Sequence, residues 1–346
     1  MAPKKPQSEK EKSAGPSPRG KNKPLKKIGV LTSGGDAPGM NACIRAATRA
    51  GLAKGLEVIG IMRGYSGIYE KQFIEMNSRS VANIVQRGGT ILESSRCDEF
   101  MTAGGRAKAA GILQNEGISG LIVIGGNGTY LGAAGLCAES PIRVVGAPGT
   151  IDNDIYGTDF TIGFDTAVNT ALEAIDRIRD TADAFHRVFF VEVMGRKSGY
   201  IALEVGIAGG AEEILIPEQS IDPETLSQTL RESFARGKRS SIIVVAEGNE
   251  TGHTIEIARY VQYRLKLDCR VCVLGHLQRG GAPTAKDRVL ASRLGTAAID
   301  GLLDEKSGYA VGEIGGQIMF TPFAEAAEKK KPLNTYSLNT MKVLTL

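Results

Sequence analysis

Two aspartates stand two residues apart in the stretch PGTIDND, directly after the apolar run IRVVGA. On an extended chain, Asp152 and Asp154 would point to the same side. One carboxylate of such a pair can accept a hydroxyl proton while the other binds Mg²⁺. Aspartate-rich turns are often only turns, so a chemical role for this pair depends on what lies beside it.

Two glycine-rich stretches also follow apolar runs. TSGGDAPGMN, residues 32–41, begins at the last residue of the run IGVLT, and GGNGTY, residues 125–130, follows the run LIVI. Glycines at a strand end let backbone N–H groups and the next helix N-terminus face a phosphate. Thr129 could bond a phosphate oxygen or simply cap that helix. Neither stretch matches GxxxxGK[ST] or the dinucleotide pattern GxGxxG, which argues against a Rossmann dehydrogenase.

Basic side chains that could bind a phosphorylated substrate are spread along the chain. Arginine binds phosphate through two donors and keeps its charge. Most isolated arginines are surface residues, but Arg270 and Arg279 flank an apolar run and a Gly-Gly turn in RVCVLGHLQRGG. Cys269 and Cys272 have CxxC spacing without a second pair, which favours a structural strand over a metal or redox site. The candidate cations are Arg96, Arg187, Arg196, Arg270, Arg279 and His276.

The elements that must position these residues are short apolar runs alternating with amphipathic stretches. Residues 167–185 and 222–238 carry apolar side chains at helical spacing. Strands alternating with helices predict parallel sheets, and eight runs predict an α/β fold with two doubly wound, Rossmann-like sheets. In that architecture ligands bind at the carboxyl ends of strands. The eight runs are IGVLT, LEVIGIM, GLIVIGG, IRVVGAP, RVFFVEVM, EEILIP, SIIVVAEG and VCVLGH.

Composition narrows the class of protein. The net charge of +4 comes from residues 1–27, which hold nine Lys/Arg against two Glu, so the remainder is mildly acidic and gives no case for nucleic-acid binding. Residues 1–25 are rich in Lys, Pro and Ser, and we expect them to be a disordered basic extension. No apolar stretch approaches a membrane span. Five scattered cysteines fit a reducing compartment, so we expect a cytoplasmic location.

Taken in order, the motifs resemble those of the 6-phosphofructokinase family, specifically its ATP-dependent, phosphofructokinase A-like type, over roughly Lys27 to Gly301. They are LTSGGDAPGMNA, GGT…SSRC, IGGNGT, PGTIDND, VEVMGR, AEG and VLGHLQRGG…DRVLASRLG. The resemblance implies transfer of the γ-phosphate of ATP to the 1-hydroxyl of fructose 6-phosphate in glycolysis, giving fructose 1,6-bisphosphate, with Mg²⁺. It implies a homotetramer in which active sites, lying in the cleft between two domains, are completed across a subunit interface.

The resemblance also assigns domains and roles. A larger nucleotide-binding domain would comprise residues 26–163 plus about 278–325, and a smaller sugar-phosphate-binding domain residues 164–277 plus about 326–346. Nucleotide-binding positions are Gly35, Tyr65, Arg96, Cys97, Gly126, Asn127, Gly128 and Thr129. Substrate-binding positions are Thr150, Asp152, Arg187, Met194, Gly195, Arg196, Glu247, Arg270, His276 and Arg279. The catalytic set is Asp152 as the general base with Thr150, Arg196 and Arg96, and the metal positions are Asp154 and Asn127.

Two positions bear on the phosphoryl donor and one on the metal. Pyrophosphate-using relatives generally carry Asp at the position of Gly128 and Lys at that of Gly149. Both positions are open here, which favours ATP. Asn127 departs from the family pattern, because ATP-dependent members commonly have Asp there, and an amide brings no charge to Mg²⁺.

A second ligand site is only partly matched. Residues that resemble the bacterial family's allosteric nucleotide positions are Arg45, Arg49, Arg179, Glu212, Arg236 and Lys238. They predict an effector site for ADP or phosphoenolpyruvate, or else a set of arginines that bridges subunits. Two alternatives for the whole protein stay open: a pyrophosphate-dependent phosphofructokinase, and a non-catalytic regulatory subunit that binds sugar phosphate.

Overall fold

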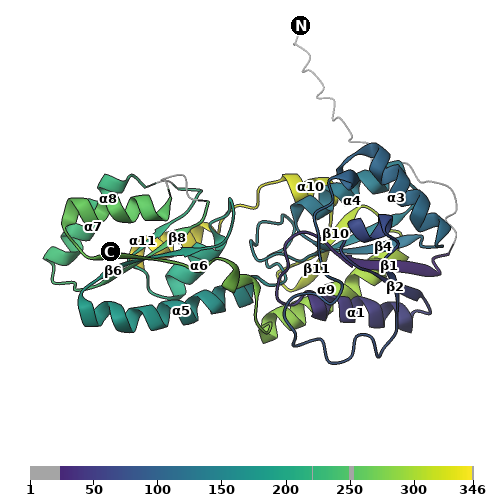
Figure 1. Ribbon diagram of the computed structural model, residues 1–346, viewed down its shortest axis with the longest axis horizontal. Helices are drawn as coiled ribbons and strands as arrows, with labels where there is room; N and C mark the ends of the chain where they lie inside the picture. Colours follow the sequence, from purple (N-terminus) through teal and green to yellow (C-terminus); the bar gives the residue numbers. More distant parts are fainter. Residues whose placement is uncertain (1–23, 220, 249–252, 345–346) are drawn as a thin grey trace, which may run out of the picture.

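The computed structural model describes residues 24–219, 221–248 and 253–344. The extension expected over residues 1–25 lies outside them apart from its last two residues, of which Leu25 is partly buried against the core. In the described residues the strands form a seven-stranded sheet and a four-stranded sheet, called here the larger and the smaller sheet. Figure 1 shows them side by side, each covered by helices. The prediction of an α/β fold with two doubly wound, mainly parallel sheets is confirmed.

The larger sheet has the strand order β11-β10-β5-β4-β1-β2-β3. Its five inner strands run parallel, and β3 and β11 pair antiparallel at the two edges. The smaller sheet has the order β7-β8-β6-β9 and is parallel throughout. The strands of the larger sheet are β1 (Lys27–Thr32), β2 (Glu57–Ile61), β3 (Phe73–Met76), β4 (Gly120–Gly125), β5 (Arg143–Pro148), β10 (Tyr309–Ile314) and β11 (Gln317–Pro322). Those of the smaller sheet are β6 (Val188–Val193), β7 (Glu213–Leu215), β8 (Ser241–Ala246) and β9 (Cys269–Val273).

All eight apolar runs become strands, whereas the patterns miss β3, β10 and β11. The two edge strands β3 and β11 are largely half-buried or exposed, so their sequences lack the continuous apolar character of an inner parallel strand. A signal was nevertheless present. Gly315 and Gly316, with φ of 56° and 80°, form a two-residue turn between β10 and β11, and a glycine pair of this length is typical of a β-hairpin.

Helices cover both faces of each sheet, and buried clusters show which helix packs where. On the larger sheet, one face is covered by α1 (Met40–Ala53) and α9 (Ala285–Leu303), and the other by α3 (Ala103–Asn115), α4 (Asn127–Glu139) and α10 (Phe323–Glu328). On the smaller sheet, one face is covered by α5 (Phe164–Phe185), α6 (Tyr200–Ala208) and α11 (Thr335–Leu344), and the other by α7 (Pro223–Ala235) and α8 (Thr254–Leu265). Shorter helices are α2 (Ser66–Tyr69), η1 (Glu99–Met101) and η2 (Gly275–Arg279).

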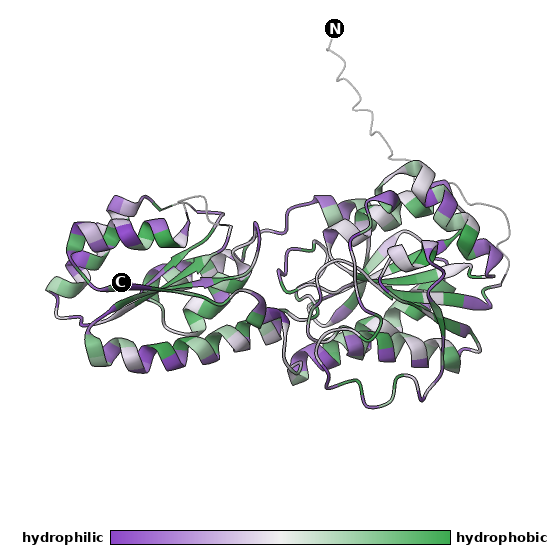
Figure 2. Cartoon of the chain, in the orientation of Figure 1, coloured by the Kyte–Doolittle hydropathy of each residue, from purple (hydrophilic) through white to green (hydrophobic). Residues whose placement is uncertain are grey.

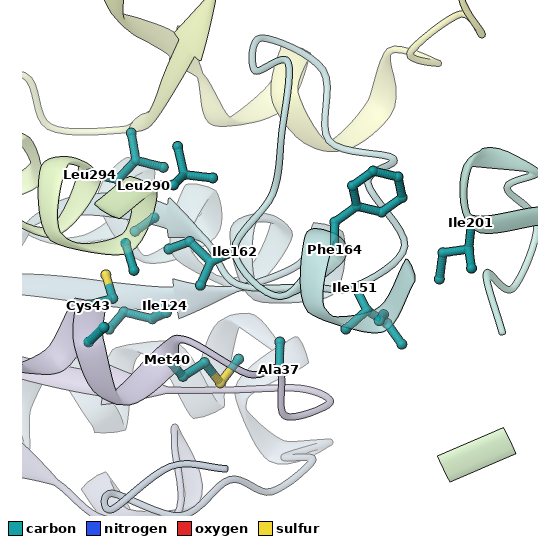
Figure 3. Packing of buried hydrophobic residues seen from close by; sticks show 14 of the residues in the cluster. Ala37, Met40, Cys43, Ile124, Ile151, Ile162, Phe164, Ile201, Leu290 and Leu294 are labelled. Atoms are coloured by element: carbon teal, nitrogen blue, oxygen red, sulfur yellow. The ribbon is translucent and has the colours of Figure 1, made fainter. Parts of the chain in front are cut away.

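The strands are apolar because both of their faces are buried. In β1, Ile28 and Val30 join the cluster under α1 and α9, while Leu31 joins the cluster under α3 and α4. The hydropathy colouring in Figure 2 shows the same result, with apolar strands inside and helices whose polar faces point outward. One buried cluster continues from the larger sheet to α6: in Figure 3, Ile151 and Phe164 lie on the side that faces Ile201. Apolar packing therefore joins the larger sheet with its helices to the smaller sheet with its helices; these are called the two halves of the molecule below.

The register of the parallel strands aligns their carboxyl ends. Thr32 at the end of β1 is paired with Ile124 in β4, and Gly125 at the end of β4 is paired with Pro148 at the end of β5. In the smaller sheet, Val193 at the end of β6 is paired with Ala246 at the end of β8. The loops that follow these strands carry both glycine-rich stretches and the aspartate pair.

Candidate active site

A pocket of about 600 Å³ lies where the loops of the two sheets meet. Segments after β1, β2, β3, β4 and β5 form its larger-sheet wall, and segments after β6, β8 and β9 form its smaller-sheet wall. Such a meeting of carboxyl ends is where ligands bind in open α/β sheets. Fifteen of the predicted site residues line the pocket: Gly35, Tyr65, Arg96, Cys97, Gly126, Asn127, Gly128, Thr129, Thr150, Asp152, Met194, Arg196, Glu247, His276 and Arg279.

Close packing holds the glycine loops of the larger-sheet wall together. The Thr129 hydroxyl donates to the carbonyl oxygen of Ser33 at 3.1 Å and so joins the β4 loop to the β1 loop. A Cβ at Gly125 would lie 2.5 Å from the same carbonyl oxygen, so only glycine fits there. The helix N-cap is Gly126 and not Thr129, which sits in the first turn of α4, so the interpretation of Thr129 as a helix cap is wrong.

The first turn of α4 lines the pocket with backbone that can receive an anion. Residues 126–129 all line it, and no acidic side chain lies in that turn. The first N–H groups of a helix have no partner within the helix and favour negative charge. A Cβ at Gly128 would meet no atom within 4 Å, so this position is open. Gly149 differs, because a Cβ there would come within 2.9 Å of Ile124 and 3.0 Å of Met40. The expectation that both positions are open therefore holds only for Gly128.

Stacked aromatic rings support one side of the pocket. The Tyr65 ring stacks on Phe100 with centroids 3.8 Å apart, and its hydroxyl donates to the carbonyl oxygen of Thr129 at 2.8 Å. Tyr65 is buried, and burial raises the pKa of its phenol well above the ordinary value. It therefore acts as a neutral, fixed support. Arg96 and Cys97 line the same part of the pocket from the segment before η1, and Arg96 is exposed.

The turn after β5 carries the two aspartates, but it is not extended as the sequence suggested. Asn153 between them has φ of 52°, in the left-handed region, so the two carboxylates do not simply share one side of a strand. Asp152 lines the pocket, and Asp154 instead accepts a hydrogen bond from the Asn127 amide at 2.7 Å. The Thr150 hydroxyl accepts from the backbone N–H of Asp152 at 3.3 Å, which ties the start of the turn to its centre.

Asp152 has the properties of a proton acceptor. Its side chain is 4% exposed, and its Oδ1 atom has no hydrogen-bond partner among the described residues. Burial, helped by the neighbouring charge of Asp154, raises the pKa of Asp152 to about 6, against the opposing effect of Arg279 and Arg196. A carboxylate with its pKa in this range is ionised near pH 7 and is a stronger base than an ordinary aspartate.

Three oxygen-bearing side chains at the base of the larger-sheet wall fit a hard cation. Asn127 Oδ1 is buried without a partner in the described chain, as is one oxygen of Asp152, and Asp154 lies beside Asn127. Burial raises the pKa of Asp154, whereas the Asn127 hydrogen bond lowers it. Carboxylate and amide oxygens are suitable Mg²⁺ ligands. Across the described ranges, no group of three or more His, Cys, Asp or Glu side chains could hold a metal by itself. A bound cation would therefore need ligands from a substrate or from water as well.

Glu247 organises the smaller-sheet wall. Its Oε1 atom accepts the backbone N–H groups of Gly195 at 3.3 Å and Arg196 at 2.7 Å, which joins the ends of β6 and β8. Arg196 has φ of 53° and an exposed side chain, and His276 is also exposed. Arg279 crosses to the other wall, where its guanidinium donates to the carbonyl oxygen of Asp36 at 3.1 Å. Gly195 itself is not among the residues that line the pocket.

Arg187 and Arg270 lie at the opposite end of the smaller sheet. Arg187 precedes β6, and Arg270 is paired with Phe189 near the start of that strand. Six residues of strand span about 20 Å, so neither side chain reaches the pocket beyond the far end of β6. Both instead pair with Asp268, at 2.7 Å and 3.1 Å. Within one chain, these two predicted substrate residues are separate from the site.

The six predicted effector residues also divide into two groups. Arg45 and Arg49 lie on α1, which covers the larger sheet. Arg179 and Lys238 both pair with Glu212 beside β7, at 3.8 Å and 3.0 Å, and Arg236 ends α7. Figure 1 shows α1 and α7 on different halves of the molecule. One chain therefore does not bring the six residues into one site.

Seven further residues line the pocket that the motifs did not single out as site residues: Ser33, Gly34, Asp36, Ser95, Asp98, Met101 and Gly149. Most of them could have been found from the sequence, because they stand next to predicted site residues in the motifs SGGD, SSRCD and PGT. Met101 had none, since it reaches the pocket only because η1 folds against α3.

The two cysteines with CxxC spacing lie in a strand and form no disulfide. Cys269 and Cys272 are free thiols within β9, and burial raises the pKa of Cys269 to about 12. This agrees with a structural strand. None of the described helices has both the length and the apolar character that a membrane crossing requires.

The fold and the pocket define an α/β protein with two parallel sheets and a ligand site where their strand ends meet. A family model described as phosphofructokinase matches residues 27–302, so the chain belongs to the phosphofructokinase family. The ATP-dependent 6-phosphofructokinase 1 of Thermus thermophilus is 57% identical over 322 residues, covering 93% of this chain and 100% of that protein. The ATP-dependent 6-phosphofructokinase of Cytophaga hutchinsonii is 56% identical over 311 residues, covering 90% and 95%.

A solved structure of phosphofructokinase from Saccharomyces cerevisiae has the same fold. It is 34% identical and superposes with a TM-score of 0.82, covering 92% of this chain and 48% of that one. This chain thus spans about half the length of the yeast chain.

Proposed function

We propose that this protein is an ATP-dependent 6-phosphofructokinase, a phosphotransferase that converts fructose 6-phosphate to fructose 1,6-bisphosphate in glycolysis. The observation that carries the mechanism is the position of Asp152. It is a buried carboxylate with a free oxygen and a raised pKa, and it lies between backbone amides on one wall and cationic side chains on the other. Two full-length relatives named for this activity, each more than half identical, support the reaction.

The larger-sheet wall is suited to the nucleotide. The first turn of α4 and the loop after β1 offer backbone N–H groups to the phosphates, and open space at Gly128 accommodates their close approach. Arg96, exposed at the rim, can donate to the transferring phosphate. The stacked Tyr65 and Phe100 rings keep this wall rigid.

The smaller-sheet wall is suited to the sugar phosphate. Arg196, His276 and Arg279 bring donors toward one region of the pocket, and Glu247 can also accept from a sugar hydroxyl. Asp152 then removes the proton of the 1-hydroxyl as its oxygen attacks the γ-phosphorus in line, the bond from that phosphorus to the β,γ-bridging oxygen breaks, and ADP leaves. Thr150 and Arg196 orient the transferring group. Positioned donors stabilise the charge that spreads over the phosphoryl oxygens.

We assign Asp154, with the amide oxygen of Asn127, as the protein's Mg²⁺ ligands. When bound, Mg²⁺ would neutralise charge on the ATP phosphates. The Asn127 amide donates to Asp154, and its own oxygen has no hydrogen-bond partner among the described residues, so the pair can offer two oxygens with one negative charge. We expect weaker Mg²⁺ binding than two carboxylates would give.

We further propose the division into domains given above and an oligomer, with four copies as the family expectation. One buried cluster belongs to the larger sheet alone and another to the smaller sheet alone, which supports two domains, while a third cluster joins them. Arg187 and Arg270 lie together on the face away from their own pocket, and the effector residues divide between two halves. In an oligomer, Arg187 and Arg270 could reach the active site of a neighbouring copy. The two groups of effector residues could likewise meet across a subunit interface. The protein is expected to act in the cytoplasm.

A coupled assay with fructose 6-phosphate tests the function. Purified protein is given ATP or pyrophosphate, each with and without Mg²⁺, and product formation is followed. We expect turnover with ATP and Mg²⁺ only. Faster turnover with pyrophosphate would favour the pyrophosphate-dependent alternative. Binding of fructose 6-phosphate without turnover by either donor would favour the regulatory subunit.

A further inference from the structure

A short segment near the C-terminus connects the larger-sheet half of the molecule to the smaller-sheet half and contacts the aspartate turn. Residues 329–334 leave α10 on the larger sheet and lead to α11, which packs beside α6 on the smaller sheet. Lys329 and Lys330 in this segment are exposed, and Lys329 pairs with Glu325 on its own helix. Lys331 differs from both, because it turns inward and is partly buried.

The Lys331 ammonium has a defined set of partners. It donates to Asn153 Oδ1 at 3.0 Å and to the carbonyl oxygen of Asp159 at 2.8 Å, and it lies 4.7 Å from the centre of the Tyr200 ring. The Tyr200 hydroxyl in turn donates to the carbonyl oxygen of Pro332 at 2.5 Å, which holds the segment directly after Lys331. Burial lowers the pKa of Lys331 to about 8, while Asp159 and Asp154 oppose that change. The ammonium form therefore prevails at neutral pH.

The residue that Lys331 holds has an unfavourable backbone conformation. Asn153 is 2% exposed and adopts φ of 52° between the two aspartates. Its Oδ1 atom also accepts the backbone N–H of Thr161 at 3.0 Å, and its amide donates to the carbonyl oxygen of Asp159 at 3.2 Å. A non-glycine residue in the left-handed region persists where its surroundings determine it, and a charged donor strengthens those bonds.

We propose that Lys331 is a positioning residue for the reaction: by holding the Asn153 side chain, it fixes the left-handed turn that aims the Asp152 carboxylate into the pocket. This proposal rests on the function proposed above and adds to it a residue that no motif contains. Lys331 does not line the pocket, and its contact with the aspartate turn is the hydrogen bond to Asn153, so we assign its effect to Asn153. Since the same segment continues into α11, the direction of the catalytic base is tied to how the two halves pack.

Three single variants test the proposal in the full-length protein. Lys331→Met removes the ammonium and keeps the apolar stem, Lys331→Arg keeps a charged donor, and Lys330→Met is the exposed, neighbouring control. We expect Lys331→Met to lower kcat about 10–100-fold, since small misplacements of a reacting group have effects of this size. The KM for each substrate should change less than about twofold, because the walls that bind them are unaltered. Lys331→Arg should recover much of the lost kcat, and Lys330→Met should match the unaltered protein.

A double-mutant cycle with Asn153→Gly separates positioning from a general loss of packing. Glycine adopts the left-handed conformation without strain and offers no side chain to Lys331. If Lys331 acts through Asn153, Lys331→Met should lower kcat much less in the Asn153→Gly protein than alone. An equal decrease in both proteins, or an unchanged kcat in Lys331→Met, would overturn the proposal. An unaltered protein without turnover would overturn the proposed function as well, and this is seen before any variant is made.

Discussion

The two walls of the pocket are built in different ways. On the larger-sheet wall, Thr129, Thr150 and Asp152 are each less than 10% exposed, and hydrogen bonds hold the chain both between loops and within the aspartate turn. On the smaller-sheet wall, Arg196, Glu247 and His276 are exposed. The Glu247 carboxylate holds the backbone N–H groups of Gly195 and Arg196, whereas the Arg196 side chain projects into the pocket. The first wall is organised before any ligand binds, because packing fixes it. The second presents charged side chains that become ordered against a ligand. Changes in the first should therefore affect kcat and folding, and changes in the second should affect KM.

The largest effect is expected on the preorganised wall, at the base. Asp152→Asn keeps the shape of the side chain but cannot accept the substrate proton. We expect kcat to fall by about 10²–10⁴, with little change in the binding of fructose 6-phosphate. Steady-state kinetics and a direct binding measurement, such as calorimetry, check the two parts. A kcat within a fewfold of the unaltered protein would remove Asp152 from its assigned role.

A smaller effect, on KM and not mainly on kcat, is expected for Arg196→Gly on the smaller-sheet wall. Glycine accepts the φ of 53° at this position, so the backbone is left in place while the guanidinium is lost. Loss of a charged hydrogen bond corresponds to about 1.5–3 kcal/mol, so the KM for fructose 6-phosphate should rise about 10–100-fold. The melting temperature should stay nearly constant because the side chain is exposed. A large loss of stability instead would show that this wall is as rigid as the other.

A matched pair of glycines measures how tightly the larger-sheet wall is packed. The Cβ of Gly125→Ala would overlap Thr129 and the Ser33 carbonyl oxygen, and we expect a loss of about 1–3 kcal/mol in the free energy of unfolding. Gly128→Ala meets open space within α4, so stability should hold or increase slightly. Denaturant unfolding of both variants without ligands gives the comparison. Equal stabilities would mean that the loop adjusts freely.

The smallest effect concerns folding stability, because the buried, ionised Asp152 carboxylate destabilises the folded protein at neutral pH. Its pKa is about 6 in the folded protein against an ordinary value of 3.8, so folding favours the protonated form. Stability from this group is present below about pH 4 and is lost as pH rises toward 6. Without metal or ligands, Asp152→Asn should therefore unfold a few degrees higher than the unaltered protein at pH 7, and the difference should disappear near pH 4. Thermal melts with a chelator across this range provide the check. A lower melting temperature at pH 7 would mean that the carboxylate stabilises the fold.

Sequence patterns were most informative about the inner strands and the loops after them. Most of the eight apolar runs are buried on both faces, so their composition reflects their position directly, although β9 at the edge of the smaller sheet is partly exposed. The edge strands β3 and β11 are only partly buried, and their mixed composition concealed them. Motif residues such as Gly126 and Asp152 could be placed at one site in advance, because carboxyl ends of parallel strands meet at one edge. Their assigned roles stay predictions.

Other properties of the site depend on contacts between distant parts of the chain. The raised pKa of Asp152 and the inward direction of Lys331 have no local signal, although the left-handed conformation of Asn153 agrees with the preference of asparagine for it. Lys331 lies among three consecutive lysines, two of which are exposed, and only the packing of residues 329–334 against Tyr200 distinguishes it. Similarly, Arg187 and Arg279 look alike in sequence, yet one lies at the far end of β6 and the other crosses the pocket to Asp36.

By itself, the sequence determined the class of fold, the positions of eight strands along the chain and the identity of the loops at their ends. It could do so because apolar periodicity and glycine content are local consequences of burial and of tight turns. Tertiary structure alone decided which side chains meet, which carboxylate is left with a free oxygen, and which lysine lies beneath the catalytic turn. Those features arise from burial and electrostatic contacts between residues far apart in the chain, which no short stretch of sequence contains.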